Sequence, residues 1–168
     1  MSGVTCPVCA ECFSTAINVE IAVRIYYLKM ADLFAKVPDA AEIFRLMAQD
    51  ESEHARTLGE AKTTGRHSDS VHGNAKTYTR SLIKLIDDFG KTMNDLPKNL
   101  DDAWEFAYTL ERSEINNIYI RLIVGTRTDL DGGEKFVLDL INEHLRRLNV
   151  LAQKYVKTQR QAILPTAK

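Results

Sequence analysis

Residue types that bind metal ions stand at helical spacing in the middle of the sequence. Glu51 and His54 lie three residues apart, so on a helix both side chains share one face. Met47 and Leu58 continue that face, which is therefore expected to point into a core. Because an ionised glutamate is rarely buried without a partner, we expect this carboxylate to bind a metal ion held between helices.

Other apolar stripes carry titratable residues as well. Glu20 lies on the first expected helix, Glu111 and Glu114 on the third, and His144 on the fourth. With Glu51 they bring four carboxylates into a dry interior, where they would repel each other strongly unless cations were bound. Mixed carboxylate and imidazole ligands favour iron or manganese, and zinc less distinctively.

These side chains need helices to position them, and helix signals dominate the sequence. No stretch alternates Val, Ile or Thr with polar residues over a useful length, so no strand is predicted. The Val37–Pro38 step ends the first helix, and Asp39 with Glu42 is typical of a capping box that opens the second. The predicted long helices span residues 7–36, 40–64, 100–127 and 134–160.

A long crossover separates the second and third of these helices. Residues 65–76 are polar and predicted to form a loop, and a shorter helix follows over residues 78–91. Such a connection lets the second and third long helices run parallel, which a short hairpin does not allow. Asn99 or Asp101 is the predicted cap of the third helix. The predicted fold is an all-α four-helix bundle with a short extra helix, in one domain over residues 1–168.

A faint internal repeat relates the two halves of the chain. Glu20 and Glu111 each follow an alanine by four residues, and His54 and His144 each precede a leucine by four. The offset is 91 residues for the glutamates (111 − 20) and 90 for the histidines (144 − 54). Two helix pairs related in this way would place their polar groups at one depth of the bundle.

The pattern resembles that of the ferritin-like di-iron carboxylate proteins, where two helices each supply a glutamate and two each supply Glu-x-x-His. More narrowly, it resembles the rubrerythrin family. In that family the third helix carries a second glutamate one turn after the first, as Glu111 and Glu114 do here. Rubrerythrins also carry tyrosines on helices one and three, and Tyr27 and Tyr119 stand at the family's spacing.

The resemblance implies a ferritin-like, non-haem di-iron protein that reduces hydrogen peroxide to water with two reduced irons. Glu114 would be a ligand that moves onto or off iron with redox state, while Tyr27 and Tyr119 would orient carboxylates by hydrogen bonds. Hydrogen peroxide or dioxygen would be the oxidant, an external donor such as a rubredoxin would supply electrons, and the chain would form a homodimer. The implied metal ligands are Glu20, Glu51, His54, Glu111, Glu114 and His144.

Two departures from the family pattern leave alternatives open. Ile141 stands three residues before His144, where the family has a glutamate, and Glu143 is about 200° from Ile141 around a helix, so it is expected to face outward. Six of seven family ligands are then present, and a single-metal site is an alternative. No rubredoxin domain is expected in the chain. Iron storage without turnover, and a metal-free scaffold whose Glu–His groups pair with Arg24 or with each other, also stay open.

Three cysteines lie close together near the start of the chain. Cys6, Cys9 and Cys12 have the spacing of three iron–sulfur ligands, but no fourth cysteine follows. His67 or His72 completes a zinc site only if the crossover returns to that end of the bundle. The favoured interpretation is three idle, reduced thiols, with both histidines exposed in a loop.

Composition excludes several classes of partner. The formal net charge of −1 over 168 residues gives no strong field for nucleic acid or an anionic membrane surface. No run of about 18 apolar residues predicts a membrane span, and no signal peptide is evident, so a cytoplasmic location is expected.

Overall fold

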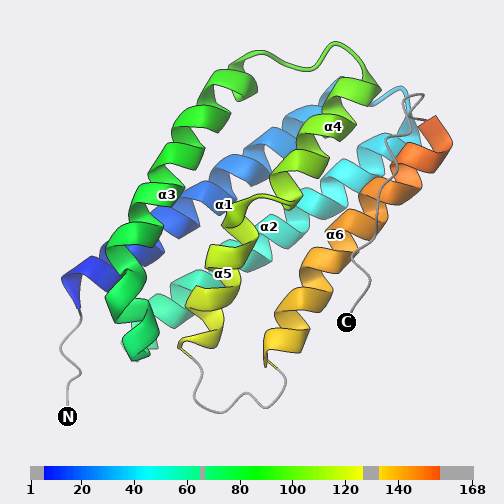
Figure 1. Ribbon diagram of the computed structural model, residues 1–168. Coiled ribbons are helices and arrows are strands. Elements are labelled where there is room, and N and C mark those ends of the chain that lie inside the picture. Colours follow the sequence, from blue (N-terminus) through cyan, green and yellow to red (C-terminus); the bar gives the residue numbers. More distant parts are fainter. Residues whose placement is uncertain (1–5, 65–66, 127–132, 156–168) are drawn as a thin grey trace.

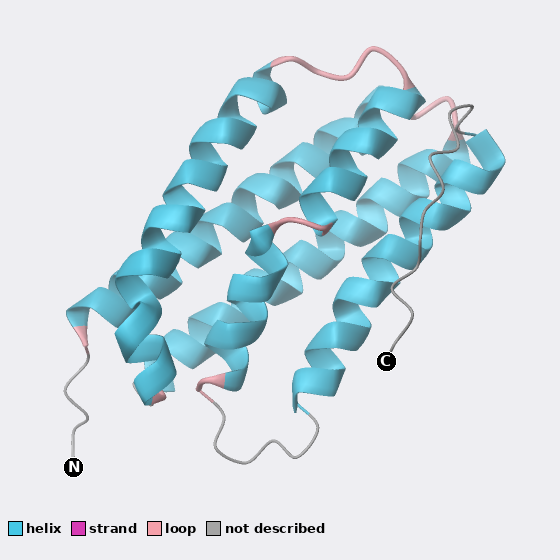
Figure 2. Cartoon of the chain, in the orientation of Figure 1, coloured by secondary structure: helices cyan, strands magenta, loops and turns pink. Residues whose placement is uncertain are grey.

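The computed structural model describes residues 6–64, 67–126 and 133–155, and within these ranges the chain is mostly helical and contains no strand (Figures 1 and 2). None of the helices in these ranges is long and apolar enough to cross a membrane. The prediction of an all-α fold is confirmed. The helices are α1 (Pro7–Leu33), α2 (Pro38–Thr64), α3 (Asp69–Asn94), α4 (Leu100–Glu111), α5 (Glu114–Val124) and α6 (Gly133–Tyr155).

The helices form one elongated bundle in which neighbours mostly run antiparallel (Figure 1). Helix α2 packs along α1, and α3 then runs back along α1 to the opposite end of the bundle. Helices α4 and α5 therefore run in the same direction as α2, which is the parallel arrangement that the crossover predicted. Helix α6 closes the bundle against α2, α4 and α5.

The crossover is more helical than predicted. Residues 69–76 belong to α3 rather than to a loop. Helix α3 therefore has 26 residues and is longer than the short helix predicted over residues 78–91. Val71, Ala75, Tyr78 and Leu82 follow each other at steps of three and four, and all four are buried. The polar residues between them give a local loop signal, so the sequence did not predict a helix there. In the structure, burial against α1 outweighs that signal.

The third predicted long helix is interrupted. Helix α4 ends at Glu111 and α5 begins at Glu114, so a continuous helix over 100–127 is wrong. The side chain of Ser113 caps α5 by accepting a hydrogen bond from the backbone N–H of Ile115 (3.3 Å), and Asn116 Nδ2 donates to the backbone carbonyl of Glu111 (2.6 Å). The predicted cap Asn99 is confirmed, since its side chain accepts from the N–H of Asp102 (2.9 Å).

The predicted capping box at the start of α2 is also wrong. Helix α2 begins at Pro38, which suits a first helical position because it lacks an N–H, and Asp39 lies inside the first turn. The carboxylate of Asp39 instead accepts hydrogen bonds from Lys154 and from the hydroxyl of Tyr155 (2.9 Å). These contacts join the start of α2 to the end of α6.

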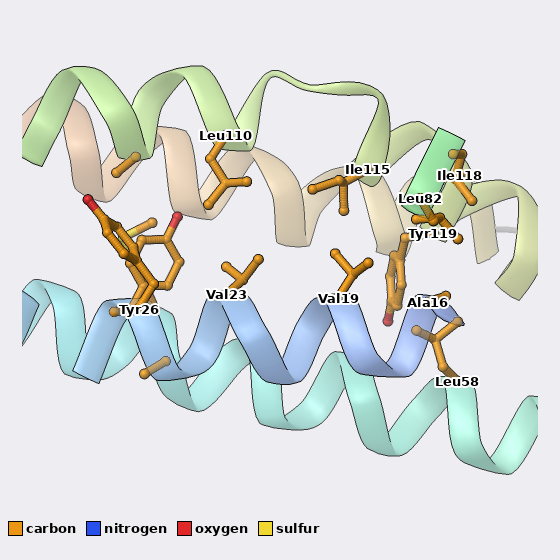
Figure 3. Packing of buried hydrophobic residues seen from close by; sticks show 14 of the residues in the cluster. Ala16, Val19, Val23, Tyr26, Leu58, Leu82, Leu110, Ile115, Ile118 and Tyr119 are labelled. Atoms are coloured by element: carbon orange, nitrogen blue, oxygen red, sulfur yellow. The ribbon is translucent and has the colours of Figure 1, made fainter. Parts of the chain in front are cut away.

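Apolar side chains fill the space around the middle of the bundle. Figure 3 shows Val19 and Val23 of α1 facing Leu110 of α4 and Ile115 of α5. On the other side, the indole N–H of Trp104 donates to the backbone carbonyl of Leu148 (2.8 Å), which ties α4 to α6. The core thus surrounds the segments that carry the predicted metal ligands.

A close approach between α3 and α5 requires glycine at position 125. A Cβ atom built there would overlap a methyl group of Val71 and lie 2.9 Å from Ser68 Oγ. Gly125→Ala is therefore expected to lower the free energy of unfolding by about 1–3 kcal/mol, measured by chemical denaturation. Gly73→Ala on α3 is the matched control, because nothing lies within 4 Å of that Cβ. Equal stability of the two variants would contradict the prediction.

Candidate metal centre

Five of the six predicted ligands meet in the middle of the bundle, and each is at most 4% exposed. The first group joins α1 and α2. His54 Nδ1 lies 2.9 Å from Glu51 Oε2 and 3.7 Å from Glu20 Oε2. Two carboxylate oxygens and one imidazole nitrogen therefore converge on a common space, a donor set that suits a divalent metal ion.

A second group of the same composition lies beside the first. His144 Nδ1 is 3.0 Å from Glu111 Oε2 and 3.7 Å from Glu51 Oε1. Glu51 belongs to both groups and turns one oxygen toward each histidine, so it is placed to bridge two metal ions. In each group the donor atoms lie within 4.8 Å of one another.

The two groups correspond to the internal repeat of the sequence. Glu20 pairs with His54 as Glu111 pairs with His144, and Glu51 lies between the pairs. The repeat partner of Glu51 is Ile141, whose side chain lies outside the part of the chain that the structure describes. Glu143 does not replace the missing carboxylate, since its oxygens bind Arg146 (2.6 Å) and Arg147 (3.1 Å).

The sixth predicted ligand, Glu114, has a side chain outside the described part of the structure. Its backbone is the first residue of α5, after the interruption that follows Glu111. The two residues therefore do not share the face of one continuous helix, which was the basis for pairing them. A ligand role for Glu114 stays a prediction.

Both predicted tyrosines lie next to these ligands. The hydroxyl of Tyr27 donates a hydrogen bond to Glu111 Oε1 (2.5 Å). Burial, followed by the charge of Glu111, raises the pKa of Tyr27 well above its usual value, so the hydroxyl keeps its proton. The ring of Tyr119 lies 4.7 Å from the ring of His54, centroid to centroid, and covers that histidine.

A polar cluster that was not predicted from the sequence contacts His144 at its Nε2 atom. The Nε2 atom of His144 lies 3.0 Å from Asp50 Oδ2, and Arg147 donates a hydrogen bond to the same oxygen. Asn116 Nδ2 also reaches Glu111 Oε2 (3.3 Å). The helical periodicity of the sequence could not identify Asp50, because its partner His144 lies on α6, 94 residues away along the chain.

The two histidines are held unequally. His144 is fixed by hydrogen bonds at both ring nitrogens, whereas His54 Nε2 is buried without a hydrogen-bond partner among the described residues. A carboxylate behind a ligating histidine fixes its ring orientation and raises its basicity. The Glu111–His144 half of the centre is therefore the more rigid half.

The buried groups of the metal-free centre hold their protons more tightly than usual. Burial, together with the charge of Glu20, raises the pKa of Glu51 well above its usual value. Burial would lower the pKa of His144, but the charge of Glu111 and the hydrogen bond with Asp50 outweigh it and raise this pKa to about 10. The pKa of His54 is also raised, because its contact with Glu20 outweighs burial.

The residues present fit a pair of metal ions. Burial raises the cost of ionising the Glu51 carboxylate, and a bound cation would remove that cost by displacing its proton. Both Nδ1 atoms already face carboxylate oxygens, so a bound cation would take the place of the protons shared between them. The donor set, buried carboxylates with imidazole, is one that iron and manganese prefer.

The contact between Asp50 and His144 makes a separate prediction. Asp50→Ala is expected to weaken divalent metal binding at the Glu111–His144 half about 10- to 100-fold, because the ring loses its fixed orientation. Anaerobic titration with Mn²⁺, which carboxylate ligands suit better than cysteine thiols do, measures the change. Glu143→Gln is the control, since the Glu143 carboxylate also binds Arg147 and, among the described contacts, makes no hydrogen bond to the His144 ring. An unchanged affinity in Asp50→Ala would show that Asp50 does not support the site.

The fold and the site together define the class of protein. A helical bundle encloses two carboxylate–histidine groups that share one glutamate, which is the arrangement of ferritin-like di-iron proteins. The family model for rubrerythrin matches residues 11–122, and the chain belongs to the rubrerythrin family. The matched segment carries Glu20, Glu51, His54 and Glu111, whereas His144 lies beyond it and joins the centre through tertiary contacts. No curated protein and no solved structure matches the chain.

Proposed function

We propose that this protein is a non-haem di-iron peroxidase of rubrerythrin type that reduces hydrogen peroxide to water. The observation that carries the proposal is the position of Glu51, which is buried between two histidines with one oxygen toward each. A buried carboxylate in that position is suited to bridging two metal ions. A surface pair or a simple structural ion pair needs no such arrangement.

Two bound ferrous ions would supply the two electrons that, with two protons, convert hydrogen peroxide into two molecules of water. The chain's own residues hold the ions and manage the surroundings. Glu20 and His54 would bind one metal, Glu111 and His144 the other, with Glu51 common to both. Asp50 holds the His144 ring at Nε2, so Nδ1 faces Glu111 and would be free to bind a metal there.

Tyr27 has a definite task in this scheme. Its hydroxyl stays protonated and holds one oxygen of Glu111, so the other oxygen remains directed toward His144. The apolar side chains around the centre limit the access of water, which strengthens every electrostatic interaction inside it. Glu114 is expected to supply the mobile carboxylate, and the external electron donor, the homodimer and the cytoplasmic location stay predictions from the sequence.

Metal analysis followed by peroxide addition tests the proposal. The purified chain, loaded anaerobically with ferrous iron, should hold two ions per chain, and each peroxide consumed should oxidise both of them to ferric iron. Metal binding without peroxide consumption would overturn the peroxidase and favour the storage function. Absence of bound metal would favour a helical scaffold and overturn both.

A further inference from the structure

A second cluster of metal-binding side chains lies at the end of the bundle where α1 begins. Cys9 Sγ is 3.2 Å from His72 Nδ1, and Cys6 completes a group whose three donor atoms lie within 4.8 Å of one another. Cys9 precedes Glu20 by 11 residues on α1, so the cluster is about 16 Å along the helix axis from the carboxylate centre. It is therefore a separate site.

The start of α1 positions the two sulfur atoms. Cys6 is the N-cap of α1, Pro7 occupies the first helical position, and Cys9 lies within the first turn. Residues three apart on a helix share a face, so Cys6 and Cys9 present their thiols to the same neighbour. Cys12, one turn further on, interacts with Thr79 and does not join the group.

The start of α3 brings the imidazole to the thiols. Helix α3 begins at Asp69, beside the start of α1, and presents His72 one turn into the helix (Figure 1). Two contacts fix this end of α3: Val71 is buried, and the backbone N–H of Ser68 donates to the carbonyl of Gly125 (2.7 Å). The crossover does return to the cysteines, which was the condition for a zinc site there, and His72 is helical rather than in a loop.

We propose that Cys6, Cys9 and His72 form a second metal site, which binds Zn²⁺ or a similar thiophilic divalent cation and fastens the start of α3 to the start of α1. Two cysteine sulfurs and one imidazole nitrogen are a donor set that zinc prefers over calcium, magnesium or manganese. Three protein ligands leave the fourth tetrahedral position to a water molecule, since His72 and Cys6 are not fully buried.

The environment of the thiols agrees with this assignment. Hydrogen bonds from Cys9 lower the pKa of Cys6 to about 7, so a thiolate forms readily at the exposed end of the cluster. Burial raises the pKa of Cys9 to about 12, so this thiol holds its proton until a bound cation displaces it. His67 stacks on Phe13 beside His72 and is not one of the three donors.

Cobalt titration of the reduced, full-length protein tests the second site. Cobalt bound to cysteine gives a thiolate-to-metal charge-transfer band that carboxylate ligands do not produce. We expect the wild-type chain to develop this band with one equivalent of Co²⁺ and to lose it when Zn²⁺ is added. Cys12→Ser and Glu51→Gln should retain the band, because neither residue belongs to the cluster.

Variants of the three ligands should lose the band. Cys6→Ser is the preferred variant, because Cys6 lies at the start of α1 and is partly exposed, whereas Cys9 is fully buried. His72→Ala is expected to weaken Co²⁺ binding at least tenfold. Absence of the band in the reduced wild-type chain would overturn the proposal. An unchanged band in Cys6→Ser, or equal loss in Cys12→Ser, would overturn it as well.

Thermal unfolding supplies a second measurement. Zinc should raise the Tm of the wild type and of Cys12→Ser, because it binds only the folded arrangement of α1 and α3. The same addition should leave the Tm of the double variant Cys6→Ser/Glu51→Gln unchanged, because neither metal centre is intact in it. Glu51→Gln disrupts the carboxylate centre and leaves the cysteines intact. A zinc effect that disappears in Glu51→Gln would therefore show that zinc stabilises the chain from the carboxylate centre, and it would overturn the proposal.

Discussion

Replacing Glu51 by alanine is expected to abolish stoichiometric iron binding, from two ions per chain to fewer than one. Each of the two candidate metal positions contains Glu51, so its loss removes one ligand from both at once. It also removes the carboxylate that lies between His54 and His144. Iron analysis after anaerobic loading and desalting measures the effect, and the same variant should consume no peroxide.

A matched control lies two residues away on the same helix. Glu53 is exposed and binds Arg56 (2.9 Å), so Glu53→Ala is expected to keep both irons. Glu51→Ala should remain folded without metal, because it removes a buried carboxyl group whose ionisation burial already opposes. Two irons retained in folded Glu51→Ala, as in Glu53→Ala, would refute the di-iron assignment.

The affinity of the metal-free protein for divalent cations is expected to rise steeply with pH. The pKa values of Glu51, His54 and His144 are all raised, so each group holds its proton to a higher pH than usual, and each must lose it to bind a metal. Low pH therefore opposes binding and high pH favours it. With one proton displaced from each residue, the affinity changes by as much as about 10³-fold per pH unit.

Titration with Mn²⁺ between about pH 6 and about pH 8, together with calorimetry in buffers of different ionisation enthalpy, counts the displaced protons. His144→Gln should bind more weakly, and its slope should fall by about one proton, because the group with a pKa of about 10 is gone. Glu143→Gln should keep the wild-type slope, since Glu143 pairs only with arginines among the described contacts. An affinity that does not change with pH would contradict the protonated state described for the metal-free centre.

Local periodicity was enough to find most of the centre. Glu51 and His54 are three residues apart, and the stripes that carry Glu20, Glu111 and His144 repeat at steps of three and four, so each could be assigned an inward position from its own helix. The internal repeat further indicated that these residues lie at the same depth along the bundle. Side-chain direction on a regular helix depends on neighbours within one or two turns, which is why the sequence alone could determine it.

Contacts across the bundle were decided only by the tertiary structure. Asp50 reaches His144, and His72 reaches Cys9, through the register in which separate helices pack. The interruption between α4 and α5 carries no proline or glycine signal, and it is stabilised by Asn116 contacting Glu111. Such pairings depend on packing between residues far apart in the chain, so no local pattern records them. The sequence by itself therefore determined which residues face the interior, and the packing of the helices decided which of them meet.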